Sequence, residues 1–72
     1  MRTIEIRDDA IRLGQLLKLA DFIDQGSDAR ELLLQGRVLV NGEVETRRGR
    51  QVVPGETVTV DGQTVGIATR ER

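Results

Sequence analysis

Residues 38–44 read VLVNGEV, and this short segment determines much of how the 72-residue chain folds. Its first half alternates valine with leucine, and such alternation is typical of a β-strand with one buried face. Asn41-Gly42 follows and supplies the strongest short hairpin signal, because both residues tolerate the positive φ angles of a type I′ turn. Val44 begins the return strand. The segment therefore predicts an antiparallel hairpin.

Alternating patterns on both sides of this hairpin predict further strands. Downstream, Pro54-Gly55 fits a type II turn. Residues 58–60 and 65–67 then alternate around a second turn at Asp61-Gly62. Upstream, the pair Ile4 and Ile6 alternates with polar residues, which is typical of a short edge strand. Together the strands favour a small antiparallel sheet.

An amphipathic helix is predicted from Ala10 to Ala20. Its apolar side chains recur at i, i+3, i+4 and i+7, which puts them on one stripe of the helix. The stripe consists of Leu13, Leu16, Leu17 and Ala20. Asp8 and Asp9 precede the segment and offer N-cap side chains. Gly14 weakens the helix by about 1 kcal/mol relative to alanine, and a glycine here would permit another backbone to approach closely.

A second, short helix is predicted after the Gln25-Gly26-Ser27 turn, with Ser27 as its N-cap. Its buried stripe consists of Ala29, Leu32 and Leu33. Gly36 is a natural stop, because glycine readily adopts the left-handed conformation that ends many helices. Leu34 falls on the opposite side of this helix, either beneath the N-terminal strand or exposed to solvent.

These elements together predict an α+β fold in which two helices pack on a small antiparallel sheet. We expect one domain spanning residues 1–72, because a chain of this length is too short for two. The helix stripes and the valine faces supply about 15 core side chains, which is near the lower limit for an independent domain.

The composition argues against several classes of function. The chain has no cysteine and no histidine, so it lacks thiolate ligands and the commonest general base. Its twelve acidic residues are scattered among polar residues, with no apolar run that would raise a carboxyl pKa. We therefore expect no enzymatic activity, no metal site and no cofactor.

The same composition bears on location and binding mode. No segment approaches the roughly 20 apolar residues that a membrane span needs, and the opening MRTIEIRDDAIR lacks the apolar region of a secretory signal. We expect a cytoplasmic monomer without a membrane partner. Phe22 is the single aromatic residue, so stacking of nucleic-acid bases on tyrosine or tryptophan cannot be a binding mode.

Arginines gather in one short run although the net charge of the chain is −1. Arg47, Arg48 and Arg50 occupy three of four consecutive positions, with Gly49 between them. Guanidinium groups bind phosphate oxygens bidentately, yet a basic run alone is more often a solvated loop. The slightly negative net charge also counts against general affinity for nucleic acids. The run indicates such binding only if other cations meet it on one face.

The order of the elements is more specific than any one of them. Two helices joined by a Gly-Ser turn, the hairpin at residues 38–44 and the later segment VPGETVTV, residues 53–60, together resemble the S4 RNA-binding domain. The resemblance covers the chain from about Ile11 to Asp61. Within that superfamily, LGQLLKL at residues 13–19 and NGEVETRRGR at residues 41–50 are similar to the small stand-alone bacterial S4-like proteins of the YbcJ/YaaA type.

The resemblance implies an αL motif, in which two helices against a sheet present a basic surface to structured RNA. Ribosomal RNA or tRNA is the implied partner, with association with the ribosome as one possibility. Carried over by position, the implied RNA-binding residues are Arg12, Lys18, Ser27, Arg30, Arg37, Asn41, Arg47, Arg48 and Arg50. Phosphate contacts would dominate, and we expect the three clustered arginines to be dispensable for the fold.

Three positions depart from the family pattern. Gln51 stands where lysine is common, which removes a cation. Ser27-Asp28 replaces a more usual glycine-rich entry to the second helix and puts an acid near a helix N-terminus. Both departures lower the expected affinity for RNA. Glu56 replaces the commoner aspartate after Pro54-Gly55, and we expect that exchange to be neutral.

Two other functions compete with RNA binding. The first is a protein-interaction adaptor on the same scaffold, which the acidic balance and the Leu34 and Leu39 side chains would suit. The second is a small enzyme or a modified carrier. A carrier that works through its C-terminus would usually end in Gly-Gly, whereas this chain ends Thr69-Arg70-Glu71-Arg72. The carrier hypothesis therefore ranks last.

Overall fold

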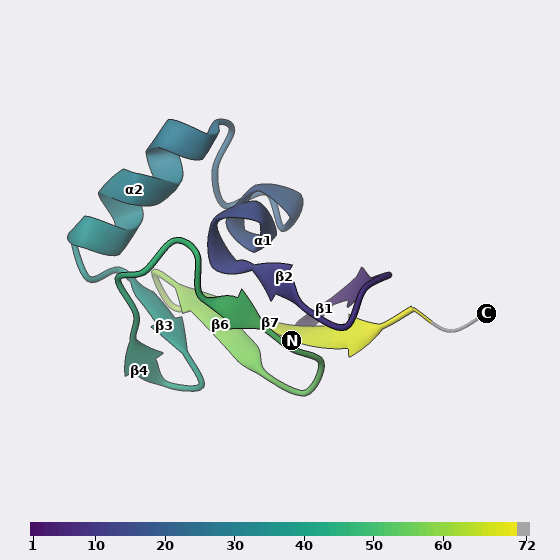
Figure 1. The fold of residues 1–72 in the computed structure, drawn as a ribbon. Coiled ribbons are helices and arrows are strands. Elements are labelled where there is room, and N and C mark those ends of the chain that lie inside the picture. The colour runs from purple at the N-terminus through teal and green to yellow at the C-terminus, as the bar shows by residue number, and fades with distance from the viewer. Residues whose placement is uncertain (71–72) are drawn as a thin grey trace.

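A computed structural model describes the chain from residue 1 to residue 70, apart from the side chains of residues 26 and 27. Two helices, α1 (Leu13–Leu19) and α2 (Gly26–Leu34), lie over one face of a five-stranded sheet (Figure 1). The strands of this sheet follow the order β1-β7-β6-β3-β4. They are β1 (Arg2–Ile6), β3 (Val38–Val40), β4 (Glu43–Val44), β6 (Thr57–Val60) and β7 (Gln63–Thr69). A separate two-stranded ribbon pairs β2 (Ile11–Arg12) with β5 (Gln51–Val52).

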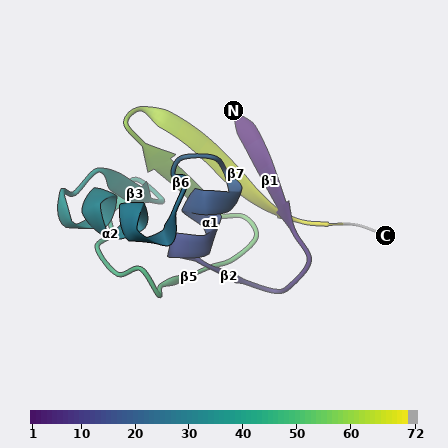
Figure 2. The ribbon, with the colours of Figure 1, turned by 90° about the horizontal axis from the view of Figure 1, so that it is seen from above.

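This arrangement confirms the predicted α+β fold, with one correction in strand direction. The strands β3, β4, β6 and β7 pair antiparallel as expected. The strand β1 instead runs parallel to β7, with Ile4 opposite Ile67, and it forms the edge of the sheet beyond β7 (Figure 2). The alternation of Ile4 and Ile6 indicates which face of the strand is buried, but it carries no information about the direction of the partner strand.

The predicted hairpin turns are present. Asn41 and Gly42 have φ angles of 53° and 83°, and Asp61 and Gly62 have φ angles of 50° and 85°. Positive φ at both central residues is the property of a type I′ turn, whose twist matches that of the flanking strands. The local sequence therefore fixes the connections β3–β4 and β6–β7.

The core lies between the helix pair and the sheet. Both predicted helix stripes are buried, and Leu13, Leu16 and Leu17 have no exposed surface. Valine and isoleucine side chains from the inner face of the sheet complete a cluster of 15 buried residues among those described. This agrees with the size expected from the sequence. Leu34 is 67% exposed, so it does not pack beneath the N-terminal strand, and Leu39 is only partly exposed.

The helix α1 begins three residues later than predicted. Ile11 and Arg12 are paired with Val52 and Gln51 in the ribbon of β2 and β5, so they are extended rather than helical. The N-cap is Arg12, whose side chain makes no capping hydrogen bond, and Asp8 and Asp9 are therefore not the caps. The sequence pattern did not show this pairing because its two halves lie about 40 residues apart.

The helix α2, unlike α1, begins earlier than predicted. Its N-cap is Gln25, so the prediction that Ser27 caps the helix is wrong. The carboxylate of Asp28 accepts a hydrogen bond from the backbone N–H of Gln25 at 3.4 Å. An acid in the first turn satisfies part of the helix end, and it also suits the helix dipole there.

Candidate nucleic-acid interface

Residues 45–50, here called the arginine loop, lie against the N-terminal end of α1. The backbone carbonyls of Arg48 and Arg50 accept hydrogen bonds from the N–H groups of Gly14 and Leu13, at 3.0 Å and 2.9 Å. Such N–H groups have no partner inside the helix, so the loop does what an N-cap side chain would do. The predicted close approach at Gly14 is confirmed, because a Cβ atom there would lie 2.6 Å from Cγ of Arg48.

Arg50 fixes the arginine loop through two carboxylates. Its Nε lies 3.2 Å from Oε1 of Glu45, and its Nη2 lies 3.1 Å from Oε2 of Glu56. Glu56 also accepts hydrogen bonds from the N–H of Val53, at 2.9 Å, and from the side-chain amide of Asn41, at 2.8 Å. These contacts tie the loop to the turn at Asn41 and to the turn at Pro54-Gly55. Arg50 therefore has a structural role that the sequence did not predict.

The same contacts lower the pKa of both carboxyl groups. Hydrogen bonds from the Arg50 side chain and the Val53 N–H hold the pKa of Glu56 at about 2, below its ordinary value of 4.5. Hydrogen bonds from the side chain and the backbone of Arg47 lower the pKa of Glu45 to about 2 as well. Hydrogen bonds of this kind favour the charged form of a carboxyl group, so both side chains are ionised in the folded chain at neutral pH.

The chain is expected to lose stability in acid between about pH 4.5 and about pH 2. A carboxyl group whose pKa is lower in the folded chain stabilises the fold above its unfolded pKa, and this contribution is lost as the pH falls through the folded pKa. The Glu56→Gln variant lacks one of these two groups, while Glu45 and Asp61, whose pKa the hydrogen bond from Arg37 also lowers, remain. The variant should therefore lose less stability in acid than wild type. Urea midpoints followed by circular dichroism across this pH range test the expectation.

The control for this titration is Glu5→Gln, which removes an exposed carboxyl group from β1. Its urea midpoint should follow the wild-type profile as the pH falls. If Glu56→Gln and wild type lost stability equally, the contacts of Glu56 would not be a source of the acid sensitivity.

Arg48, unlike Arg47 and Arg50, lines a hollow beside α1. The hollow has a volume of about 390 Å³ and is lined by Arg12, Gly14, Gln15, Lys18, Arg48 and Gly49. Its three cations come from β2, from α1 and from the arginine loop, and no carboxylate of the described residues lines it. The ion pairs found among the described residues involve other arginines. Three cations without ion-pair partners therefore meet in one place.

A second hollow, of about 310 Å³, shares Arg48 with the first. Its lining consists of Arg30, Leu33, Leu34, Thr46 and Arg48. Arg30 comes from α2 and is exposed, so the second hollow extends the row of cations onto the other helix. We call the four side chains of Arg12, Lys18, Arg30 and Arg48 the basic surface.

Arg37 and Asn41 have partners within the protein. Arg37 forms an ion pair with Asp61, and this contact raises the pKa of the guanidinium. Asn41 donates to Glu56 and accepts a hydrogen bond from the N–H of Thr57 at 3.0 Å. Neither side chain lines the two hollows of the basic surface. Their contact with RNA stays a prediction.

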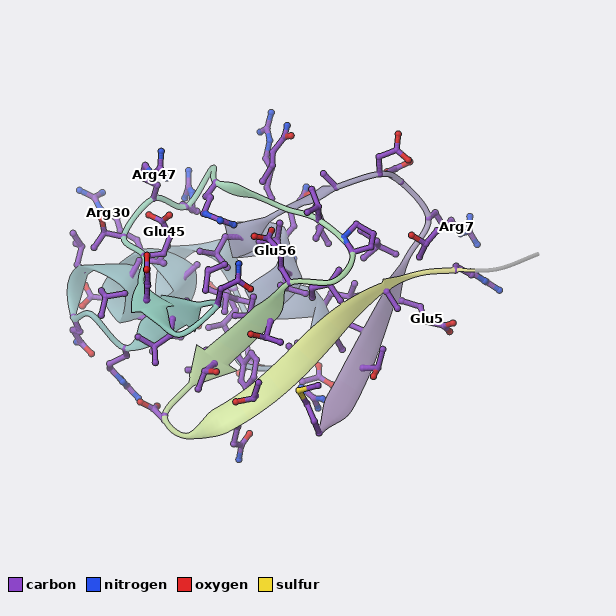
Figure 3. All side chains as sticks on the ribbon, turned by 90° about the horizontal axis from the view of Figure 1, so that it is seen from below. Glu5, Arg7, Arg30, Glu45, Arg47 and Glu56 are labelled. Atoms are coloured by element: carbon purple, nitrogen blue, oxygen red, sulfur yellow. The ribbon has the colours of Figure 1, made fainter. Side chains whose placement is uncertain are left out.

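Arg47 and Ser27 complete the predicted set. Arg47 is 75% exposed and pairs with Glu45 at 3.1 Å. It projects from the same end of the molecule as Arg30, whereas Arg7 lies at the opposite end (Figure 3). Ser27 belongs to the first turn of α2, and its side chain lies outside the described part of the structure.

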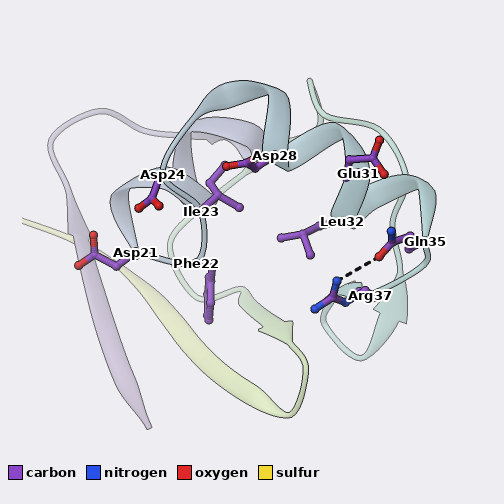
Figure 4. A pocket seen from close by; sticks show the side chains of 9 residues that line it. All are labelled: Asp21, Phe22, Ile23, Asp24, Asp28, Glu31, Leu32, Gln35 and Arg37. Carbon is purple, nitrogen blue, oxygen red and sulfur yellow. Dashed lines mark hydrogen bonds between the residues drawn. The ribbon is translucent and has the colours of Figure 1, made fainter.

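Acidic side chains gather around another hollow, of about 400 Å³, on a different side of the helix pair (Figure 4). It is lined by Asp21, Phe22, Ile23, Asp24, Asp28, Glu31, Leu32, Gln35 and Arg37. On α2, Arg30 stands about 200° around the helix axis from Asp28, at 3.6 residues per turn. This separation explains how a chain of net charge −1 presents a surface of cations. The single aromatic ring, Phe22, lies on the acidic side.

The sequence reasoning missed two polar side chains that line these hollows. Gln15 joins Arg12 and Lys18 in the first, and Thr46 joins the second. The three-residue spacing of Arg12, Gln15 and Lys18 could have indicated a shared side of the chain, because residues three apart on a helix are neighbours. Thr46 carried no such signal, since its position depends on the long-range docking of the arginine loop.

The interior offers no alternative site among the described residues. No group of three acidic side chains there lies where it could hold a metal ion. Every buried side-chain nitrogen or oxygen of the described part has a hydrogen-bond partner. No helix of that part is long and apolar enough to cross a membrane. The exposed cations are therefore the candidate site among the described residues.

Comparison with known proteins gives four results. The family model of the S4 domain matches residues 4–68. The chain is 46% identical over 59 residues to the probable ribosome maturation protein RlbA of Bacillus subtilis (strain 168), covering 82% of this chain and 83% of that protein. It is 44% identical over 54 residues to the small ribosomal subunit protein uS4m of Schizosaccharomyces pombe, covering 75% of this chain and 16% of that protein. The solution structure of YbcJ from Escherichia coli, described as revealing an αL motif involved in RNA-binding, matches 94% of this chain and 87% of YbcJ with a TM-score of 0.72 and 33% identity.

Proposed function

The chain belongs to the S4 domain family, and we propose that it binds structured RNA through the basic surface. The observation that carries this proposal is the hollow lined by Arg12, Lys18 and Arg48, which no carboxylate of the described residues lines. Cations held close together without partners repel one another, and an anion between them relieves that repulsion. The similarity of the fold to that of YbcJ also supports the proposal, because the αL motif of YbcJ is described as involved in RNA-binding.

Phosphate groups are the main contacts in this mechanism. The guanidinium forks of Arg12, Arg30 and Arg48 each match two phosphate oxygens, and Lys18 adds a point charge. Phe22 lies on the acidic side, so aromatic stacking contributes nothing, and the shape and 2′-hydroxyl groups of the RNA matter more than base identity. If three or four phosphates are neutralised, log affinity falls with log salt at a slope of roughly −2 to −4.

We infer that the RNA is ribosomal and that the chain works as a cytoplasmic monomer. Two relatives carry ribosomal names, since RlbA is called a probable ribosome maturation protein and uS4m a small ribosomal subunit protein. A surface of four cations supports only modest affinity, and a large folded RNA offers many phosphates within reach of it. Crosslinking in cells, followed by sequencing of the recovered RNA, tests this assignment. Recovery of mainly tRNA would contradict the assignment to ribosomal RNA and indicate tRNA as the bound RNA.

The double variant Arg12→Ala/Arg48→Ala should bind a structured RNA about ten-fold more weakly than wild type, at about 0.7 kcal/mol for each exposed contact. Removing two phosphate contacts should also make the salt slope shallower by about 1.5. Fluorescence anisotropy with a labelled fragment of ribosomal RNA, repeated at several salt concentrations, measures both quantities.

The matched control is Arg7→Ala/Arg70→Ala, which removes the same charge from exposed positions away from the basic surface. Arg7 lies at the far end of the molecule from Arg30 (Figure 3). The control should keep nearly the wild-type affinity and slope. Equal losses in the two double variants would mean that net charge, rather than this surface, sets the affinity, and the proposal would fail.

A further inference from the structure

The second hollow beside Arg48 combines apolar and cationic side chains. Leu33, which is 1% exposed, forms its floor, and Leu34, which is 67% exposed, stands at its rim. Thr46, Arg30 and Arg48 complete the lining. The first hollow has no leucine among its lining residues. The two hollows therefore suit different parts of a ligand.

The polar groups of the second hollow are available to a ligand. Arg30 and Arg48 take no part in the ion pairs of the described residues. Thr46 uses its backbone N–H, and not its hydroxyl, to contact Glu45 at 2.9 Å. Two cationic residues and one hydroxyl-bearing residue thus line the same hollow as two leucines.

From this combination we propose that the second hollow seats one unpaired nucleotide, such as a bulged nucleotide of a folded RNA. The inference rests on the proposed function, because the same RNA engages the basic surface. An unpaired nucleotide offers an exposed base face, a 2′-hydroxyl and two flanking phosphates. Leu34 packs against the base, Thr46 hydrogen-bonds to the ribose or the base edge, and the two arginines bind the phosphates. A nucleotide stacked within a helix hides its base face and cannot use Leu34.

The neighbouring charges distinguish Leu34 from an ordinary surface leucine. Single exposed leucines are common on proteins, and Leu19, at the end of α1, is one that is 54% exposed but does not line this hollow. Leu34 instead shares a hollow with two guanidiniums. A neutral partner that covered Leu34 would strip water from Arg30 and Arg48 without giving them an anion, which is costly. RNA supplies the apolar contact and the anions together.

The test compares two RNA hairpins that differ at one position of the stem. One carries a single bulged nucleotide, and in the other an added nucleotide on the opposite strand pairs with it, so that the stem is continuous. Wild type should bind the bulged hairpin about five-fold more tightly, less than a full aromatic stack would supply. Leu34→Gln should lose this preference while keeping wild-type affinity for the continuous hairpin. The glutamine keeps helix propensity at the last residue of α2.

Leu19→Gln is the control, because it makes the same exchange at an exposed last residue of the other helix. It should keep the five-fold preference. Equal binding of both hairpins by wild type would overturn the nucleotide seat but leave the proposed function standing. The nucleotide seat would also be overturned if Leu34→Gln kept the preference for the bulged hairpin, or if that variant lost affinity equally for both hairpins. Binding of neither hairpin would instead count against the proposed function itself.

Discussion

Replacing Arg50 by alanine should lower the free energy of unfolding by about 2 kcal/mol, below the 3–5 kcal/mol of a fully buried pair. The change would leave Glu45 and Glu56, only 13% and 18% exposed, without the guanidinium that lies between them. Glu56 would lose the hydrogen bond that does most to lower its pKa, and Glu45 would keep only Arg47 as an ion-pair partner among the described residues. For a domain of this size the melting temperature should fall by about 10 °C. Thermal unfolding followed by circular dichroism measures the change.

Arg47→Ala is the matched comparison, because it removes an arginine of the same run. The Arg47 side chain is 75% exposed, and its partner Glu45 keeps Arg50. Exposed ion pairs contribute little to stability, so the melting temperature should stay close to that of wild type. Similar melting temperatures for Arg50→Ala and Arg47→Ala would contradict the structural role given to Arg50.

The contacts of Arg50 argue against an expectation drawn from the sequence. A run of arginines predicts a solvated, dispensable loop, and that description fits Arg47. Arg50 looks the same in the sequence, but its side chain is only 26% exposed because Glu56, six residues later, is brought beside it by the turn at Pro54-Gly55. The substitution of all three arginines would therefore damage the fold as well as the surface.

Local patterns were sufficient for most of the fold. The hairpin at residues 38–44 and the two leucine stripes depend on neighbours within four residues, so their periodicity is visible in the sequence. The direction of β1 and the start of α1 depend on β7 and β5, far along the chain. No periodicity encodes such partners. The order of the elements also came from local patterns, and it carried the family resemblance that the S4 domain match confirms.

The candidate site was predictable as a set of residue types but not as a surface. Four of the implied residues, the basic surface, line two hollows that share Arg48. Arg37, Asn41, Arg47 and Arg50 instead contact Asp61, Glu56 or Glu45. Which cation meets a carboxylate depends on how the loop docks on α1. That docking depends in turn on one glycine.

Gly14→Val should weaken RNA binding about three-fold, at about 0.7 kcal/mol for the displaced Arg48, and lower the melting temperature by about 10 °C, because overpacking typically costs 1–3 kcal/mol. A Cβ at position 14 would lie 2.6 Å from Cγ and 3.1 Å from Cδ of Arg48, so that side chain must shift. We expect the two additional methyl groups of valine to push the arginine loop itself away from α1. The N–H groups of Gly14 and Leu13 would then lose their carbonyl acceptors, and Arg48 would leave the first hollow. Valine and glycine differ little in helix propensity, which offsets little of this cost.

Two further variants separate the effect on binding from the effect on stability. Gly14→Ala adds only the Cβ and gains about 1 kcal/mol of helix propensity, so it should melt near the wild-type temperature and still bind RNA more weakly, because Arg48 is displaced. Gly49→Ala changes a glycine of the same loop with no atom within 4 Å of the added Cβ, so it should melt like wild type. Because Gly49 lines the first hollow, this variant is a control for stability alone. Fluorescence anisotropy measures RNA binding by the three variants, and thermal melts measure their stability. Wild-type affinity in Gly14→Ala would show that the position of Arg48 does not govern binding, since the clash acts on that side chain first.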